Sequence, residues 1–144
     1  MRIPPATSRI VLAALFAFAG TMHFIVPDAY VGIMPPALPL HRELVYLSGV
    51  LEIAGGIGLL VPRTRRVAGI GLILLLLAVW PANLQMLLNA RAAGTSAAWQ
   101  QLLLLRLPLQ LVLIAWVWRA SRSRFRDAVG SLVDARWLAI GRVP

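Results

Sequence analysis

The sequence contains no cysteine. A chain without thiols cannot carry out thiol–disulfide exchange, ligate an iron–sulfur cluster or bind zinc through thiolates. Redox chemistry in this protein would therefore need a cofactor supplied from outside the chain. The two histidines, His23 and His41, could ligate a metal or haem, but their spacing is not diagnostic of either. We expect no metal site, with His23 hydrogen-bonded to a neighbouring helix and His41 exposed in a loop.

Charge is also scarce. Only 13% of the 144 residues are charged, 60% are apolar, and the mean hydropathy is +0.80, which lies outside the usual range of a soluble domain. A bilayer core of about 30 Å requires roughly 20 predominantly apolar residues per helix. The sequence therefore predicts an all-α integral membrane four-helix bundle within residues 1–120, with helices at about residues 8–26, 44–61, 67–88 and 98–118.

Lysine is absent, and all fourteen basic residues are arginine. Arginines precede the first apolar run, fill the second loop and follow the fourth run, at Arg2, Arg9, Arg63, Arg65, Arg66, Arg119, Arg122, Arg124, Arg126, Arg136 and Arg142. The opposite loops carry only Arg42 and Arg91. The positive-inside rule then places both termini in the cytoplasm. The net charge of +9 indicates contact with anionic membrane lipid and not with nucleic acid.

A signal peptide is a second interpretation of the first apolar run. Arg2 and Arg9 precede it, and residues 17–19 (Ala-Phe-Ala) form a small-x-small cleavage pattern. Cleavage would leave three helices, which the charge rule allows equally well. The apolar run continues past this point to Val26 and is long enough to span a bilayer, so we favour an uncleaved first helix.

Each apolar run contains one residue that is costly to place in a membrane: His23, Glu52, Asn83 and Arg106. At 1.5 Å per residue along alternating helices, all four fall in the outer half of the predicted bundle. Gln110 follows Arg106 by four residues and shares its helix face. The sequence therefore predicts one polar binding cluster formed by these five residues. Ordinary polar contacts between membrane helices are the alternative.

Glu52 and Arg106 are expected to form an ion pair within this cluster. A charged side chain at the centre of a membrane helix costs about 2.5 to 3.5 kcal/mol on insertion scales. Arg106 cannot avoid that cost by losing a proton, and its planar guanidinium matches a carboxylate.

Proline and glycine positions refine the picture of the helices. Pro81 and Pro108 each remove a backbone N–H, which predicts kinks beside the polar cluster. Gly49, Glu52 and Gly56 share one helix face at spacings of three and four residues. That face should allow a neighbouring backbone to approach Glu52 closely.

The first outer loop, residues 27–43, is unusually apolar and rich in proline. Its beginning resembles a short helix start, and the prolines that follow predict an extended, stiff return. We expect it to lie over the outer mouth of the bundle as a lid whose contacts come from Tyr30, Met34, Pro35, Pro36 and His41. A tight connection that dips into the lipid headgroups is the alternative.

Residues 121–144 form a basic tail with apolar side chains at helical spacing, namely Phe125, Val129, Leu132 and Val133. This pattern predicts an amphipathic helix on the cytoplasmic leaflet. Docking of a partner protein is the alternative.

A set of motifs covering about residues 8–120 resembles the DoxX-like family of small bacterial membrane proteins. The residues that carry the resemblance are His23-Phe24, Pro27, Tyr30, Ile33-Met34-Pro35-Pro36, Leu38-Pro39, Ser48-Gly49, Glu52, Gly55-Gly56, Gly58-Leu59-Leu60, Pro62 and Pro81-Ala82-Asn83. The resemblance implies a four-helix, multi-pass protein of the bacterial inner membrane and a subunit of a redox assembly. Related groups use cysteines for thiol chemistry, so that activity does not transfer to this chain.

Three classes of function follow. The first is a membrane subunit that binds a quinone-like or lipid-like small molecule at the polar cluster, beside a redox protein partner or within a homo-oligomer. The second is a small transporter or permeability pathway that uses the same cluster as its substrate site. The third is an accessory or assembly protein in which the cluster is structural. Because the chain has no electron carrier of its own, catalysis by the isolated chain is the least favoured interpretation.

Overall fold

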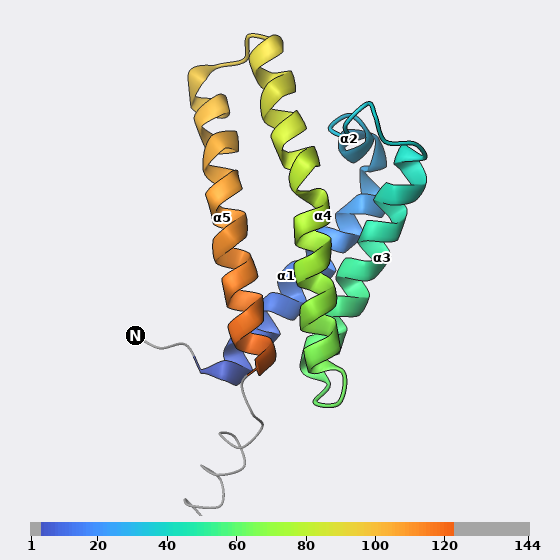
Figure 1. Ribbon diagram of the computed structural model, residues 1–144, viewed down its shortest axis with the longest axis vertical. Coiled ribbons are helices and arrows are strands. Elements are labelled where there is room, and N and C mark those ends of the chain that lie inside the picture. The colour runs from blue at the N-terminus through green and yellow to red at the C-terminus, as the bar shows by residue number, and fades with distance from the viewer. Residues whose placement is uncertain (1–3, 123–144) are drawn as a thin grey trace, which may run out of the picture.

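The structure, a computed structural model, describes residues 4–122, and all regular secondary structure in this range is helical. Four long helices and one short helix follow one another along the chain (Figure 1). They are α1 (Pro5–Ile25), α2 (Pro27–Val31), α3 (His41–Leu60), α4 (Arg65–Ala92) and α5 (Ala97–Arg122). The predicted amphipathic tail lies outside the described residues.

The four long helices are each apolar and long enough to cross a membrane, with mean hydropathy between 1.5 and 2.2 over their most apolar windows. This finding confirms the four apolar helices predicted from the sequence and identifies the chain as a multi-pass membrane protein. The short helix α2 adds a fifth, at the helix start predicted in the first outer loop.

The helices α4 and α5 are longer than predicted. They span 28 and 26 residues, whereas the sequence indicated 67–88 and 98–118. The length of an apolar run reflects the thickness of the hydrocarbon layer that a helix crosses. The backbone hydrogen bonds of the helix continue beyond that run into its polar ends. Both helices also continue through their prolines, Pro81 and Pro108.

The helices α1 and α3 lie side by side, and glycine makes their close approach possible (Figure 1). A Cβ atom built on Gly20 of α1 would lie 2.6 Å from the carbonyl oxygen of Gly49 in α3. A Cβ atom on Gly49 would lie 2.8 Å from the carbonyl oxygen of Gly20. The small-residue face predicted for α3 therefore does admit a neighbouring backbone, and that backbone belongs to α1.

Two separate clusters of buried apolar side chains define the packing. The larger one lies toward the α3–α4 loop and draws on all four long helices, through Leu12, Phe16, Leu59, Leu72, Leu76, Val117 and Ala120. The smaller one lies toward the α4–α5 loop and draws on α4 and α5 alone, through Leu87, Ala90 and Leu103. The α1–α3 pair and the α4–α5 pair thus share a core at one end of the bundle, and in the described residues no shared cluster joins them at the other.

Candidate functional site

A cavity of about 660 Å³ lies between the two helix pairs, in the half of the bundle that α2 covers. Most of its wall is aliphatic, and polar side chains reach it from each of the four long helices. They are His23, Ser48, Glu52, Asn83, Arg106 and Gln110. All five residues of the predicted polar cluster therefore face one cavity. A pocket of this size with apolar walls and a few convergent polar groups has the usual form of a small-molecule site.

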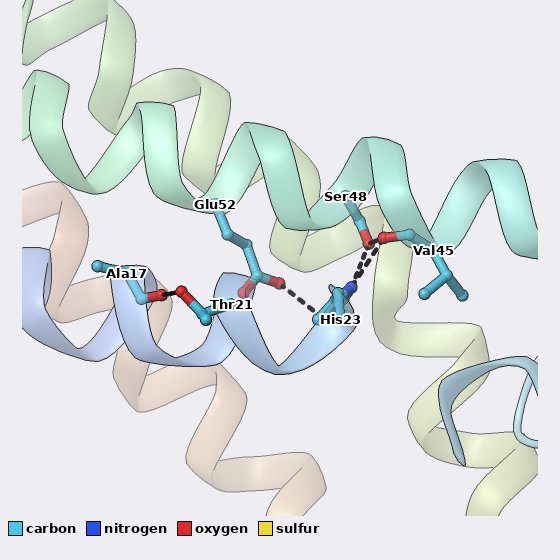
Figure 2. A network of polar contacts seen from close by, with 6 residues as sticks. All are labelled: Ala17, Thr21, His23, Val45, Ser48 and Glu52. Atoms are coloured by element: carbon cyan, nitrogen blue, oxygen red, sulfur yellow. Dashed lines mark hydrogen bonds and ion pairs between the residues drawn. The ribbon is translucent and has the colours of Figure 1, made fainter. Parts of the chain in front are cut away.

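His23 connects α1 to α3 through both of its ring nitrogens. Its Nδ1 atom lies 2.9 Å from the carbonyl oxygen of Val45 and 2.8 Å from the hydroxyl oxygen of Ser48. The Ser48 hydroxyl itself donates to the Val45 carbonyl at 2.9 Å. The Nε2 atom lies 3.6 Å from Oε1 of Glu52, and both side chains are buried. Figure 2 shows the ring of His23 held between these two groups of α3.

The roles of the two ring nitrogens depend on the tautomer of His23. A carbonyl oxygen only accepts, so the contact of Nδ1 with Val45 is a hydrogen bond when Nδ1 carries the proton. In that tautomer Nε2 forms an ion pair with Oε1 of Glu52 when the ring is protonated.

Glu52 and Arg106 interact electrostatically, but among the described residues they do not form the expected ion pair. Among the described residues the ionic partner of Glu52 is His23, and no ion pair involves Arg106. The close approach of α1 to α3 brings His23 to Glu52, whereas Arg106 reaches the cavity from α5 on the other helix pair. Arg106 donates a weak hydrogen bond from Nη1 to the sulfur of Met86 at 3.9 Å.

Two amide side chains join α4 to α5 across the cavity. Asn83 donates from Nδ2 to Oε1 of Gln110 at 2.7 Å, and Nε2 of Gln110 donates to the backbone carbonyl of Leu76. Gln110 is buried, and both the oxygen and the nitrogen of its amide form hydrogen bonds with α4. These residues therefore act in part as contacts between helices, as the alternative interpretation of the cluster expected.

Removal of the Asn83 amide should have a modest effect on stability. In Asn83→Leu the Oε1 atom of Gln110 loses its donor, and we expect the free energy of unfolding to fall by about 1 kcal/mol, within the range of hydrogen bonds between membrane helices. Denaturant titration of the purified protein measures this change. The double variant with Gln110→Leu should lose less than the sum of the two single variants. Additive losses would show that the two amides do not depend on each other.

The helix α2 and the turns after it cover the cavity, as predicted for the lid. Tyr30, Met34 and Pro35 line the cavity, and the rings of Tyr30 and His23 lie 4.0 Å apart between centroids. Burial raises the pKa of the Tyr30 hydroxyl above its ordinary value, so this hydroxyl stays protonated.

Two lid residues and the form of the return differ from the prediction. Pro36 and His41 are not part of the cavity wall. His41 is the first residue of α3 and not a loop residue, and its Nε2 atom donates to the carbonyl oxygen of Pro35 at 3.2 Å. The return is also not extended, because the backbone N–H groups of Met34 and Leu38 close turns onto Val31 and Pro35.

The lid is tied to α3 and α4 by polar side chains that the sequence did not single out. Asp28 of α2 accepts a hydrogen bond from Arg42 of α3 in an exposed ion pair. Asn89 of α4 donates to the carbonyl oxygen of Gly32 at 3.1 Å. Neither contact has a sequence signal beyond the polarity of the residues.

Ser48 is the polar residue that the long helices contribute to the cavity wall beyond the predicted cluster. It lies four residues before Glu52, and this spacing places the two side chains on the same face of α3. That spacing was a usable signal. In residues 4–122 the structure has no group of three or more histidine and acidic side chains able to hold a metal ion.

A family model matches residues 12–121, and its description is a domain of unknown function, DUF8561. The chain belongs to this family. The match begins within α1, includes all of α3 and α4 and nearly all of α5, and contains every residue of the cavity wall. No curated protein and no solved structure matches the chain.

Proposed function

We propose that this DUF8561 protein is a membrane subunit that binds a quinone-like or lipid-like small molecule in the cavity between the two helix pairs. The observation that supports this function is the cavity itself, with about 660 Å³ of space, mostly aliphatic walls and polar groups from every long helix. Structural contacts alone would favour a filled interior, because membrane helices gain stability from close packing. The resemblance to the DoxX-like proteins supports the further proposal that the subunit works within a redox assembly.

The arginines support an orientation for this subunit. In the described residues the α3–α4 end of the bundle carries Arg9, Arg63, Arg65, Arg66, Arg119 and Arg122, and the α2 end carries Arg42 and Arg91. By the positive-inside rule we propose that the α3–α4 end faces the cytoplasm of a bacterium. The cavity then lies in the outer half of the inner membrane.

Native mass spectrometry of the protein extracted from its own membrane tests the binding function. We expect the wild type to retain a small molecule of constant mass and Ala82→Phe to lose most of it, because Ala82 lines the cavity and a phenyl ring would occupy that space. Ala115→Phe is the matched control, since Ala115 is exposed on α5 and lies outside the cavity wall. A wild type without a bound molecule, or equal retention in Ala82→Phe, would contradict the proposed function.

A further inference from the structure

Arg106 forms no ion pair with any residue in the range 4–122, although it interacts electrostatically with Glu52 across the cavity. Arg106 lies nine residues into α5, about 14 Å along a helix that crosses the membrane, and it lines the cavity. A guanidinium does not lose its proton in proteins. Ionisable groups at this depth ordinarily pair with an opposite charge, because an unpaired charge is costly in hydrocarbon.

The remaining polar groups of the cavity wall do not provide an ion-pair partner for Arg106. The carboxylate of Glu52 on α3 has its ion-pair contact with His23 on α1. Tyr30 on α2 is protonated, and the polar side chain that α4 contributes is the neutral amide of Asn83. In the described part of the chain, Arg106 is therefore the arginine of the cavity wall, and it has no ion-pair contact there.

The apolar part of the cavity continues to the lipid-facing surface. Leu15, Leu47, Leu51 and Leu109 line the cavity and are also exposed on the outside of the helices. In a bilayer these side chains contact acyl chains, so an occupant can extend an apolar tail past them while its head stays at Arg106. A volume of about 660 Å³ suits one small ligand and not a two-chain phospholipid.

We propose that the cavity binds a single-tailed amphiphile with an anionic oxygen head group, which Arg106 holds as its counter-ion. A carboxylate or a phosphate monoester presents the oxygen pair that the guanidinium fork recognises. This inference rests on the proposed function and narrows it to anionic, lipid-soluble ligands.

Equilibrium dialysis of the full-length protein in phosphatidylcholine nanodiscs provides the test. The probes are radiolabelled dodecanoate and dodecanol, at a pH well above the pKa of the probe carboxyl group, with empty nanodiscs as the blank. We expect dodecanoate to bind at one site at least about tenfold more tightly than dodecanol, because a hydrogen-bonded charge contributes roughly this much. Dodecyl phosphate, measured in the same way, separates a phosphate head from a carboxylate head.

Three variants test whether Arg106 is the residue that binds the carboxylate of dodecanoate. Arg106→Gln should weaken dodecanoate binding by about tenfold or more and leave dodecanol unchanged. Arg106→Lys keeps the charge without the planar fork and should retain part of the preference, which guards against a folding defect in the glutamine variant. Arg91→Gln is the matched control, because Arg91 lies at the end of α4 outside the cavity wall, and its binding should equal that of the wild type.

The outcomes separate this inference from the function on which it rests. Equal binding of dodecanoate and dodecanol, or an Arg106→Gln variant that keeps the preference, would overturn the anion inference and leave a neutral ligand in the same cavity. Failure of dodecanoate, dodecyl phosphate, dodecanol and a short-chain alkyl quinone to bind above the blank would overturn both.

Discussion

His23→Leu is expected to lower the free energy of unfolding by about 3 kcal/mol, the largest effect of any single change at the cavity. The substitution leaves Glu52 buried without its ionic partner, and Oε2 of Glu52 already has no hydrogen-bond partner among residues 4–122. Glu52 can take up a proton, which keeps the loss at the lower end of the range for a broken buried pair. Denaturant titration, followed by the fluorescence of the five tryptophans, measures the loss.

A double-mutant cycle separates the pair from the individual residues. The variant with both His23→Leu and Glu52→Leu removes both polar groups, so it should be more stable than His23→Leu alone. The same cycle with Glu52→Leu and Arg106→Leu should show weaker coupling than the cycle with His23, because Glu52 and Arg106 interact electrostatically without forming an ion pair. Strong coupling between Glu52 and Arg106, with none between Glu52 and His23, would contradict the geometry described above.

The contrast between these two cycles shows what the sequence could predict. Counting residues along alternating helices gives the depth of a side chain in the membrane, and depth was enough to bring His23, Glu52, Asn83 and Arg106 to one cavity. Depth says nothing about which helices are neighbours or how each is rotated. The partner of Glu52 depends on both, and the pairing with Arg106 was wrong for that reason.

The information that could have corrected the pairing was local. Gly49 and Gly56 flank Glu52 on one face of α3, and this face predicted a close neighbour without naming it. The neighbour is α1, which has its own glycine at the contact, Gly20. A search for a second helix with a glycine on its polar face would have favoured α1 and therefore His23.

The lid shows a different limit of the sequence. Proline content correctly indicated a helix start at Pro27 and a connection that covers the bundle, since proline restricts the backbone whatever its surroundings. The turns that replace the extended return depend on hydrogen bonds donated by the residues between the prolines. Those bonds follow from the position of the chain against the cavity and have no pattern in the sequence.

Gly20→Ala is the second substitution with a large expected effect, a loss of about 1 to 3 kcal/mol in the free energy of unfolding. The new Cβ atom would lie 2.6 Å from the carbonyl oxygen of Gly49 and 2.8 Å from Cγ1 of Ile53. A carbonyl oxygen of a helix backbone cannot rotate away as a side chain can, so α1 and α3 must separate. Denaturant titration under the same conditions as for His23→Leu measures the loss.

Gly71→Ala is the matched control for this substitution. Gly71 lies in α4, and a Cβ atom added there meets nothing within 4 Å. Alanine is the better helix former by up to about 1 kcal/mol, so this variant should be as stable as the wild type or slightly more stable. Equal losses in the two variants would indicate a general response of membrane helices to alanine. A loss confined to Gly20→Ala would show that contact between the backbones of α1 and α3 stabilises the packing that places His23 beside Glu52.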